Sequence, residues 1–165
     1  MPLIDSILNE LDQEAQITRR LFERINDTHL DYQPHPKSRT LGALALHIAS
    51  VPGAIAELAL QDKVQAPNFV DPVPASVQEV TQTHEESIAK AKKILNGVSD
   101  EVLMSSWTMT RGGREVFSQP KIAVLRTIML NHCYHHRGQL SVYLRELDVP
   151  LPSIYGPSAD ENPFA

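Results

Sequence analysis

The sequence predicts a single all-α domain with the architecture of a four-helix bundle. Apolar residues recur at spacings of three and four along four long segments, as they do on the buried face of an amphipathic helix. Short or proline-containing connections separate these segments, which favours packing of neighbouring helices against one another. The chain of 165 residues, 42% of them hydrophobic, is long enough to bury one sizeable core.

The first two helices are predicted over residues 3–25 and from Thr40 to about residue 62. Thr40 is a suitable N-cap, because its hydroxyl can accept a hydrogen bond from a backbone amide of the first turn. Pro52 lies inside the second segment and is expected to kink it, since proline removes one backbone hydrogen bond and crowds the preceding turn.

A third helix is predicted to begin at Ser76, after a proline-rich connection. Ser76 can cap this helix with Glu79 at the capping-box position, and Gly97 provides the stop. Short β-like runs then flank Gly112 and Gly113, which indicates a small hairpin or extended loop before the last helix.

The fourth helix is predicted to start at Pro120, which fits a first helical turn, and to end near Leu147. Ser118 or Gln119 is expected to supply its N-cap. The remaining stretch, VPLPSIYGPSADENPFA, is a proline-rich, non-helical C-terminal tail of the same domain, which spans residues 1–165.

Residues 41–60, LGALALHIASVPGAIAELAL, are apolar enough and about long enough to cross a bilayer. His47, Pro52 and Glu57 argue against a membrane span, as does the lack of an aromatic belt or a basic flank. The segment is therefore interpreted as a helix enclosed by protein, which places His47 in an interior and predicts no membrane partner.

Charge and cysteine content exclude further classes of protein. The net charge of -5 is spread along the chain, and no block of Lys or Arg resembles a nucleic-acid contact surface. The single cysteine, Cys133, cannot form an internal disulfide or a cysteine-rich zinc site, which suits a reducing cytoplasm. The N-terminus turns acidic at once and lacks a signal-peptide pattern, so a cytoplasmic location is expected.

Three of the seven histidines lie within the stretch NHCYHHRGQL, residues 131–140. In a helix, His132 and His136 are one turn apart on the same apolar face, whereas His135 lies to one side of it. His47 also shares the apolar, inward face of its helix. Three imidazoles from two helices can bind a divalent ion and leave a position open for water or substrate, which is the catalytic pattern.

Less specific interpretations compete with a metal site. A single histidine on an apolar face is usually a core residue with one satisfied hydrogen bond, and helical His-x-x-x-His pairs also arise by chance. Three inward imidazoles favour the metal, because burying them without partners is costly. His29, His35 and His84 are assigned to the surface, and Cys133 is interpreted as a small packed thiol.

Two stretches resemble a known family. NHCYHHRGQLSVYLRELDVPLPSIYGPSADE is similar to the C-terminal signature of the DinB-like (YfiT-like) metalloenzymes, and TLGALALHIASVPG is similar to their second-helix motif. The resemblance implies a bundle in up-down-down-up order, a homodimer, and a metal triad at His47, His132 and His136. It also implies a divalent cofactor such as zinc or nickel, and three-imidazole sites can take iron or manganese as well. Relatives include thiol-dependent transferases, and the family name implies no contact with DNA.

Two classes of function follow. The first is a metal-dependent enzyme, either a transferase that joins a low-molecular-weight thiol to a small electrophile or a hydrolase-like enzyme, with His135, Gln139 and Tyr143 as cleft residues. Coordination would ionise the thiol, so that no separate base is required, and the sequence shows none. The second class is a non-catalytic, stress-associated bundle that binds a metal or a small molecule. A metal-free helical interaction module is a third.

Overall fold

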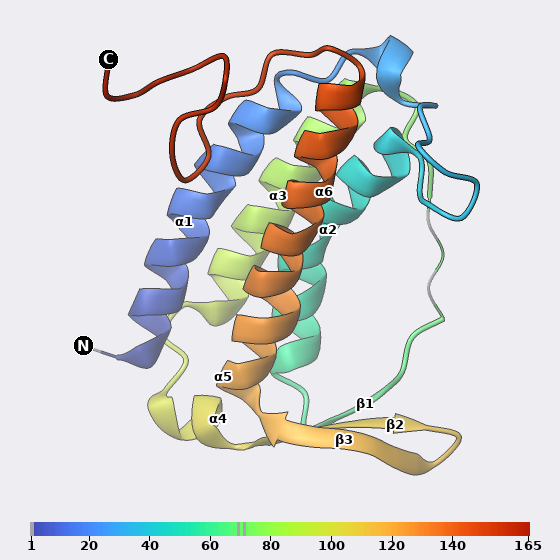
Figure 1. The fold of residues 1–165 in the computed structure, drawn as a ribbon. Coiled ribbons are helices and arrows are strands. Elements are labelled where there is room, and N and C mark those ends of the chain that lie inside the picture. The colour runs from blue at the N-terminus through green and yellow to red at the C-terminus, as the bar shows by residue number, and fades with distance from the viewer. Residues whose placement is uncertain (1, 69, 71) are drawn as a thin grey trace.

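The computed structural model describes residues 2–68, 70 and 72–165 and is mostly helical, as the periodicity predicts. The four long helical segments are α1 (Leu3–Phe22), α2 (Leu41–Ala59), α3 (Val77–Leu95) and the continuous run of α5 (Lys121–Val124), η2 (Leu125–Asn131) and α6 (His132–Glu146). Each segment ends within three residues of its predicted end. In Figure 1 the segments lie side by side, with α1 and α6 running away from the small sheet and α2 and α3 running toward it.

The expected N-caps of α2 and α3 are confirmed. The hydroxyl of Thr40 accepts a hydrogen bond of 3.2 Å from the backbone amide of Ala43. The hydroxyl of Ser76 accepts one of 3.2 Å from the amide of Glu79, whose carboxylate in turn accepts from the amide of Ala75 at 2.7 Å. Side-chain oxygens thereby satisfy amides that the first helical turn leaves without a partner.

The expected N-cap of the fourth helix is wrong. Ser118 and Gln119 belong to strand β3 (Arg114–Pro120), which continues up to the helix, so neither side chain is placed to cap it. Pro120 occupies the N-cap position. The amide of Lys121 donates instead to the carbonyl of Ser105 at 3.0 Å, so backbone of a neighbouring segment satisfies it.

A three-stranded sheet covers one end of the bundle, with strand order β1-β2-β3 (Figure 1). The predicted hairpin is confirmed: β2 (Ser106–Arg111) and β3 are antiparallel, and Gly112 and Gly113 turn the chain with φ of 56° and 78°. β1 (Lys63–Gln65) pairs with β2 in parallel and was not predicted, because three residues show no periodicity. The short helices η1 (Asp27–His29) and α4 (Asp100–Met104) lie in connections and were not predicted either.

The last long helix contains a π-helical stretch, η2, directly before His132. Backbone angles stay in the right-handed helical region at Val124 and at His132, so the helix is continuous through the wider turn. π-helical turns are rare and occur often at functional sites. Nothing in the apolar spacing of LRTIMLN indicates this turn.

Helix α2 is long and apolar enough to span a membrane, but 67% of its most apolar window is buried inside the protein. Helix α2 continues past Pro52, and Ser87 of α3 bonds to the backbone on both sides of this proline. The amide of Gly53 donates to the hydroxyl of Ser87 at 2.8 Å, and that hydroxyl donates to the carbonyl of Ser50 at 3.1 Å. A Cβ atom on Gly53 would lie 2.9 Å from the carbonyl oxygen of Ser87, so glycine permits this close approach.

Two clusters of buried apolar side chains fill the bundle. On the last helix, the cluster nearer the sheet includes Leu125, Met129 and Leu130, and the other cluster includes Leu140 and Leu144. The segment between these two groups carries the histidines. The helix thus holds its imidazoles at the boundary between two packed regions, where its backbone is fixed from both sides.

Candidate metal centre

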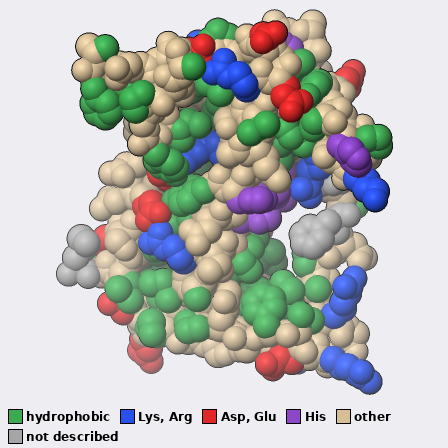
Figure 2. All heavy atoms as spheres, viewed as in Figure 1, with side chains coloured by type: hydrophobic (Ala, Val, Ile, Leu, Met, Phe, Trp, Pro, Cys, Tyr) green, Lys and Arg blue, Asp and Glu red, His purple; other side chains and the backbone are tan. Residues whose placement is uncertain are grey.

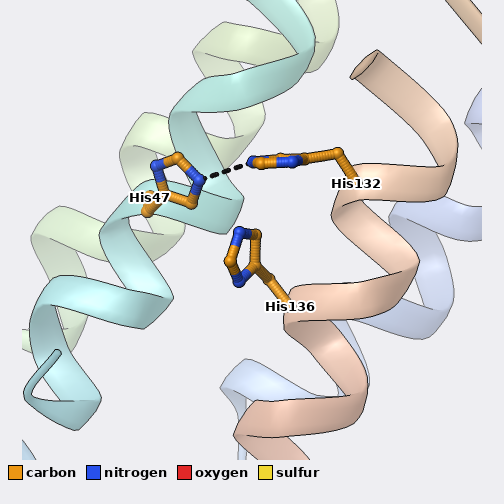
Figure 3. Close-up of side chains that lie close together, drawn as sticks. All are labelled: His47, His132 and His136. Atoms are coloured by element: carbon orange, nitrogen blue, oxygen red, sulfur yellow. Dashed lines mark hydrogen bonds between the residues drawn. The ribbon is translucent and has the colours of Figure 1, made fainter. Parts of the chain in front are cut away.

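His47 of α2 and His132 and His136 of α6 point toward one another across the space between the two helices (Figure 3). The Nε2 atoms of His47 and His132 lie 2.8 Å apart. The ring centroid of His136 lies 4.7 Å from that of His47 and 4.4 Å from that of His132. One ring nitrogen from each histidine falls within 4.8 Å of the other two. The structure therefore brings together the three histidines that helical geometry selected.

Local structure explains this convergence. The cap at Thr40 and the contact between Gly53 and Ser87 anchor α2 on both sides of His47, which fixes the direction of its side chain. His132 and His136 are separated by one α-helical turn, so their rings lie on the same face of α6, where they meet edge-to-face.

The spacing of these nitrogens fits one divalent ion. Metal–imidazole bonds of about 2.0–2.1 Å at roughly tetrahedral angles place two ligand nitrogens about 3.3 Å apart. The 2.8 Å between the Nε2 atoms of His47 and His132 needs an opening of only a few tenths of an ångström. Within the described residues, this is the group of His, Cys, Asp or Glu side chains that could hold an ion, and it contains no carboxylate.

Gln139 fixes the orientation of His136. The side-chain oxygen of Gln139 lies 2.7 Å from Nδ1 of His136, where it can accept a hydrogen bond from that nitrogen. A proton held on Nδ1 leaves the lone pair on Nε2, which is the nitrogen that faces the other two rings. Gln139, predicted as a cleft residue, is itself exposed and orients one of the three imidazoles.

The surroundings of His132 keep its ring neutral. Burial, together with the smaller effects of the nearby charges of His136, His135 and Arg39, lowers the pKa of His132 to about 4. A neutral imidazole is the form that binds a metal, so His132 is ready to do so at neutral pH. Arg39, in the loop before α2, has no motif that would identify it from the sequence.

The other two predicted cleft residues differ in position. His135 is exposed, with its ring centroid 4.9 Å from that of His136, so it lies beside the three imidazoles as its helical angle predicts. Tyr143 is half-buried and packs edge-to-face against Tyr32, with ring centroids 6.0 Å apart.

The remaining histidines include one incorrect assignment. His35 is exposed, and His29 is half-buried at the end of η1, where its Nδ1 accepts a hydrogen bond from the amide of Asn26. His84 is not at the surface: it is 4% exposed and meets Phe22 edge-to-face at 5.4 Å. The physical reason is its helical phase, because it lies on the same face of α3 as the buried residues Val80, Ser87, Ala91 and Leu95.

Cys133 faces away from the imidazoles. It lines a small cavity together with residues of α1, α2 and α3, among them Leu11, Ile48 and Ile88, and this lining does not include His47, His132 or His136. Burial raises the pKa of the Cys133 thiol to about 12, which leaves it protonated and unreactive at neutral pH. The interpretation as a packed thiol agrees with this position.

An apolar cavity of about 120 Å³ adjoins the three imidazoles, and His47 and His132 form part of its wall. Its other walls come from α2, from the last helix and from the sheet, a combination that no local pattern in the sequence indicates. In Figure 2 histidine side chains reach the surface in the middle of the visible face, beside a hollow with hydrophobic side chains below it.

Comparison with known proteins agrees with this fold. The model of the DinB family matches residues 2–162. The protein YrdA of Bacillus subtilis (strain 168) is 28% identical over 159 residues, which cover 96% of this chain and 91% of YrdA.

Among solved structures, a DinB-like protein from Bacillus cereus ATCC 10987 is 25% identical, with a TM-score of 0.72 over 92% of this chain and 97% of the other. YfiT from Bacillus subtilis, a four-helix bundle of unusual topology, is 14% identical, with a TM-score of 0.64 over 88% of both chains. With a family model that spans nearly its whole length, the chain belongs to the DinB family.

Proposed function

We propose that this protein is a divalent-metal-dependent enzyme that transfers a small cellular thiol to a small electrophile. One observation carries the proposal: His47, His132 and His136 converge from two helices at the end of an apolar cavity. Three protein ligands leave room for a further ligand on the same ion, and the cavity lies where a second reactant would be held.

The protein's own residues supply the framework for this chemistry. His132 is held neutral by burial, and Gln139 presents Nε2 of His136 to the centre of the cluster. Zinc or nickel is the proposed ion, with iron or manganese as alternatives, and when bound it would lower the pKa of a coordinated thiol from its free value of ~8.5. The positive charge of Arg39, which acts on His132, favours an anionic ligand at the same place.

A thiol suits this cluster because it requires no protein base. The groups within reach of one another are three imidazoles, and no carboxylate joins them among the described residues. Cys133 lines a different cavity from the one beside the imidazoles, and burial keeps its thiol protonated, so the proposed nucleophile comes from a second molecule. A small external thiol that ionises when it binds the ion needs no carboxylate base and brings the nucleophile from outside the protein.

Metal-dependent hydrolysis is the second candidate. YfiT, which shares the fold, is described as a probable metal-dependent hydrolase. The same three histidines would hold the ion, and water would take the place of the thiol.

Cobalt-substituted protein without an affinity tag separates these candidates. Cysteine and glutathione should each produce a sulfur-to-cobalt absorption band, and the protein should then catalyse the substitution in which the thiolate displaces chloride from 1-chloro-2,4-dinitrobenzene. This activity should vanish on chelation and return with metal, and it should persist in His29→Ala.

The alternatives give different results in the same assay. Cleavage of a p-nitrophenyl ester without thiol, combined with no sulfur-to-cobalt band, would replace the transferase by a hydrolase. Stoichiometric metal with neither reaction would favour a non-catalytic protein that binds a metal or a small molecule.

A further inference from the structure

The apolar cavity beside the histidines has three walls built from distant parts of the chain. Helix α2 contributes Val51, Ile55 and Leu58, which follow His47 at helical spacing along the same face. One wall therefore leads directly from an imidazole into apolar surface.

The sheet forms the second wall. Trp107 of β2 is 1% exposed, and its indole nitrogen donates to the carbonyl of Leu58 at 2.9 Å, which fixes the ring against α2. Val64 of β1 and Met109 of β2 stand beside each other in the parallel register and line the same cavity. Because a hydrogen bond and two paired strands hold it, this wall exists before any ligand arrives.

The last helix forms the third wall. Val124, Ile128 and His132 line the cavity and are spaced four residues apart, with the π-helical stretch η2 between them. The i to i+5 bonding of a π-helix gives a wider turn, which brings residues four apart closer to one line than in an α-helix. His132 thus lies in line with Val124 and Ile128 along the same wall of the cavity.

We infer that this cavity binds one compact apolar group of the substrate, either a single aromatic ring or a branched alkyl group of similar size. The inference rests on the proposed function, because it places the reacting, polar end of that substrate at His47 and His132. An apolar cavity of about 150 Å³ accepts benzene in another protein, so about 120 Å³ suits one ring or slightly less.

The chemistry of the walls also limits the substrate. A charged group would lose its hydration among Val, Ile, Leu, Met and Trp side chains. Apart from the histidines, Gln65 is the polar side chain in this lining and it carries no charge, so a charged group belongs at the imidazole end. The electrophile is therefore expected to carry its apolar group close to the reacting atom, because both histidines stand in the cavity wall.

Three small probes test the cavity and the metal position separately. Fluorobenzene, followed by ¹⁹F NMR on metal-free protein, reports on the cavity alone. Acetohydroxamate, followed by the absorption of cobalt-loaded protein, reports on the open metal position alone. Benzohydroxamate on the cobalt-loaded protein reports on both together, since it combines a metal-binding group with one ring.

Ile55→Phe fills the cavity from α2, and Ile88→Phe is its matched control, because Ile88 is also a half-buried isoleucine but lines other cavities on α3. In wild type and Ile88→Phe, fluorobenzene should bind, and benzohydroxamate should bind roughly 10- to 100-fold more tightly than acetohydroxamate. In Ile55→Phe, fluorobenzene binding and the advantage of benzohydroxamate should both disappear, while acetohydroxamate binding should remain.

The outcomes distinguish the two proposals. Absence of fluorobenzene binding to wild type would overturn the cavity assignment, whatever the metal does. Equal affinities for the two hydroxamates would overturn the placement of the apolar group next to the ion. If fluorobenzene binds but acetohydroxamate leaves the absorption of the cobalt-loaded protein unchanged, the apolar cavity is upheld and the proposed open metal position is contradicted.

Discussion

The Nε2 atoms of His47 and His132 approach to 2.8 Å although 85 residues separate them in the chain. At this distance one imidazole donates a hydrogen bond to the other, so the pair is satisfied without an ion. A divalent ion would take the place of this hydrogen bond and use both nitrogens as ligands, and the proton between them would move to Nδ1 of its own ring. Because the pKa of His132 is lowered to about 4, this ring is already neutral at pH 7, so metal binding is expected to weaken only as the pH falls toward 4 and protons compete with the ion.

Replacing any of His47, His132 or His136 by Ala should lower the metal content of untagged protein sharply. Two imidazoles hold a divalent ion weakly, so the loss of one ligand affects the whole site. Elemental analysis after gel filtration measures the stoichiometry. His35→Ala, at an exposed position, is the control and should retain the wild-type content. Unchanged stoichiometry in His47→Ala would remove α2 from the site.

Gln139→Ala should weaken metal binding by about 10- to 100-fold, as is usual when the partner of a ligand histidine is lost. Without the 2.7 Å contact to Gln139, the ring of His136 can turn and can carry its proton on either nitrogen. Competition with a chromophoric chelator measures the affinity. His135→Ala should leave it nearly unchanged, because His135 is exposed beside the cluster; a loss equal to that of His136→Ala would contradict the arrangement in Figure 3.

The features that sequence predicted are those that depend on neighbours in the chain. The pair His132 and His136 follows from one helical turn, and the hairpin follows from Gly112 and Gly113. The inward face of α2 was visible because apolar residues surround His47 at helical spacing. These patterns lead to a helical bundle with three histidines in its interior.

The features that sequence missed arise from contacts between distant segments. β1 exists because Lys63–Gln65 pairs with β2, and the cavity exists because Trp107 packs on Leu58. The wrong surface assignment of His84 has another origin. Its polar neighbours in sequence suggested solvent, but the spacing of buried residues from Val80 to Leu95 already placed it on the inner face of α3.

Glu14→Ala should lower the free energy of unfolding by about 3–5 kcal/mol, because it leaves the buried positive charge of Arg137 without its carboxylate partner. Arg137 is 2% exposed and pairs with Glu14 at 2.5 Å, and it also bonds to Thr18 and Tyr155. Urea denaturation measures the change. Glu85→Ala is the matched control, since Glu85 pairs with Arg19 at the surface and its loss should have little effect. If Glu14→Ala lowered the free energy of unfolding as little as Glu85→Ala, the buried pair would contribute little to stability.

A homodimer remains a prediction from the family resemblance. Exposed apolar side chains such as Val116 on β3 and Val142 on α6 offer surface that an isologous contact between two copies could cover. Light scattering at high protein concentration should give twice the mass of the chain. A monomer mass across the whole concentration range would contradict the prediction.

His84 should make the protein less stable as the medium becomes mildly acidic. Burial lowers the pKa of His84 to about 4, and the positive charge of Arg19 adds to the effect. In the unfolded chain the pKa is about 6.5, so between these two values the unfolded state binds more protons. Stability that is present above pH 6.5 is therefore lost as the pH falls toward 4, by roughly 2–4 kcal/mol for this group.

His84→Phe removes the titrating group and keeps an aromatic ring next to Phe22. Urea midpoints of metal-free protein between pH 4 and 7 should then depend less on pH than those of wild type. Part of the dependence should remain, because the pKa of His132 is also lowered to about 4 and acts with the same sign. His35→Phe, at an exposed position, should keep the wild-type pH dependence. Parallel curves for wild type and His84→Phe would show that His84 is protonated in the folded protein or does not lie inside it.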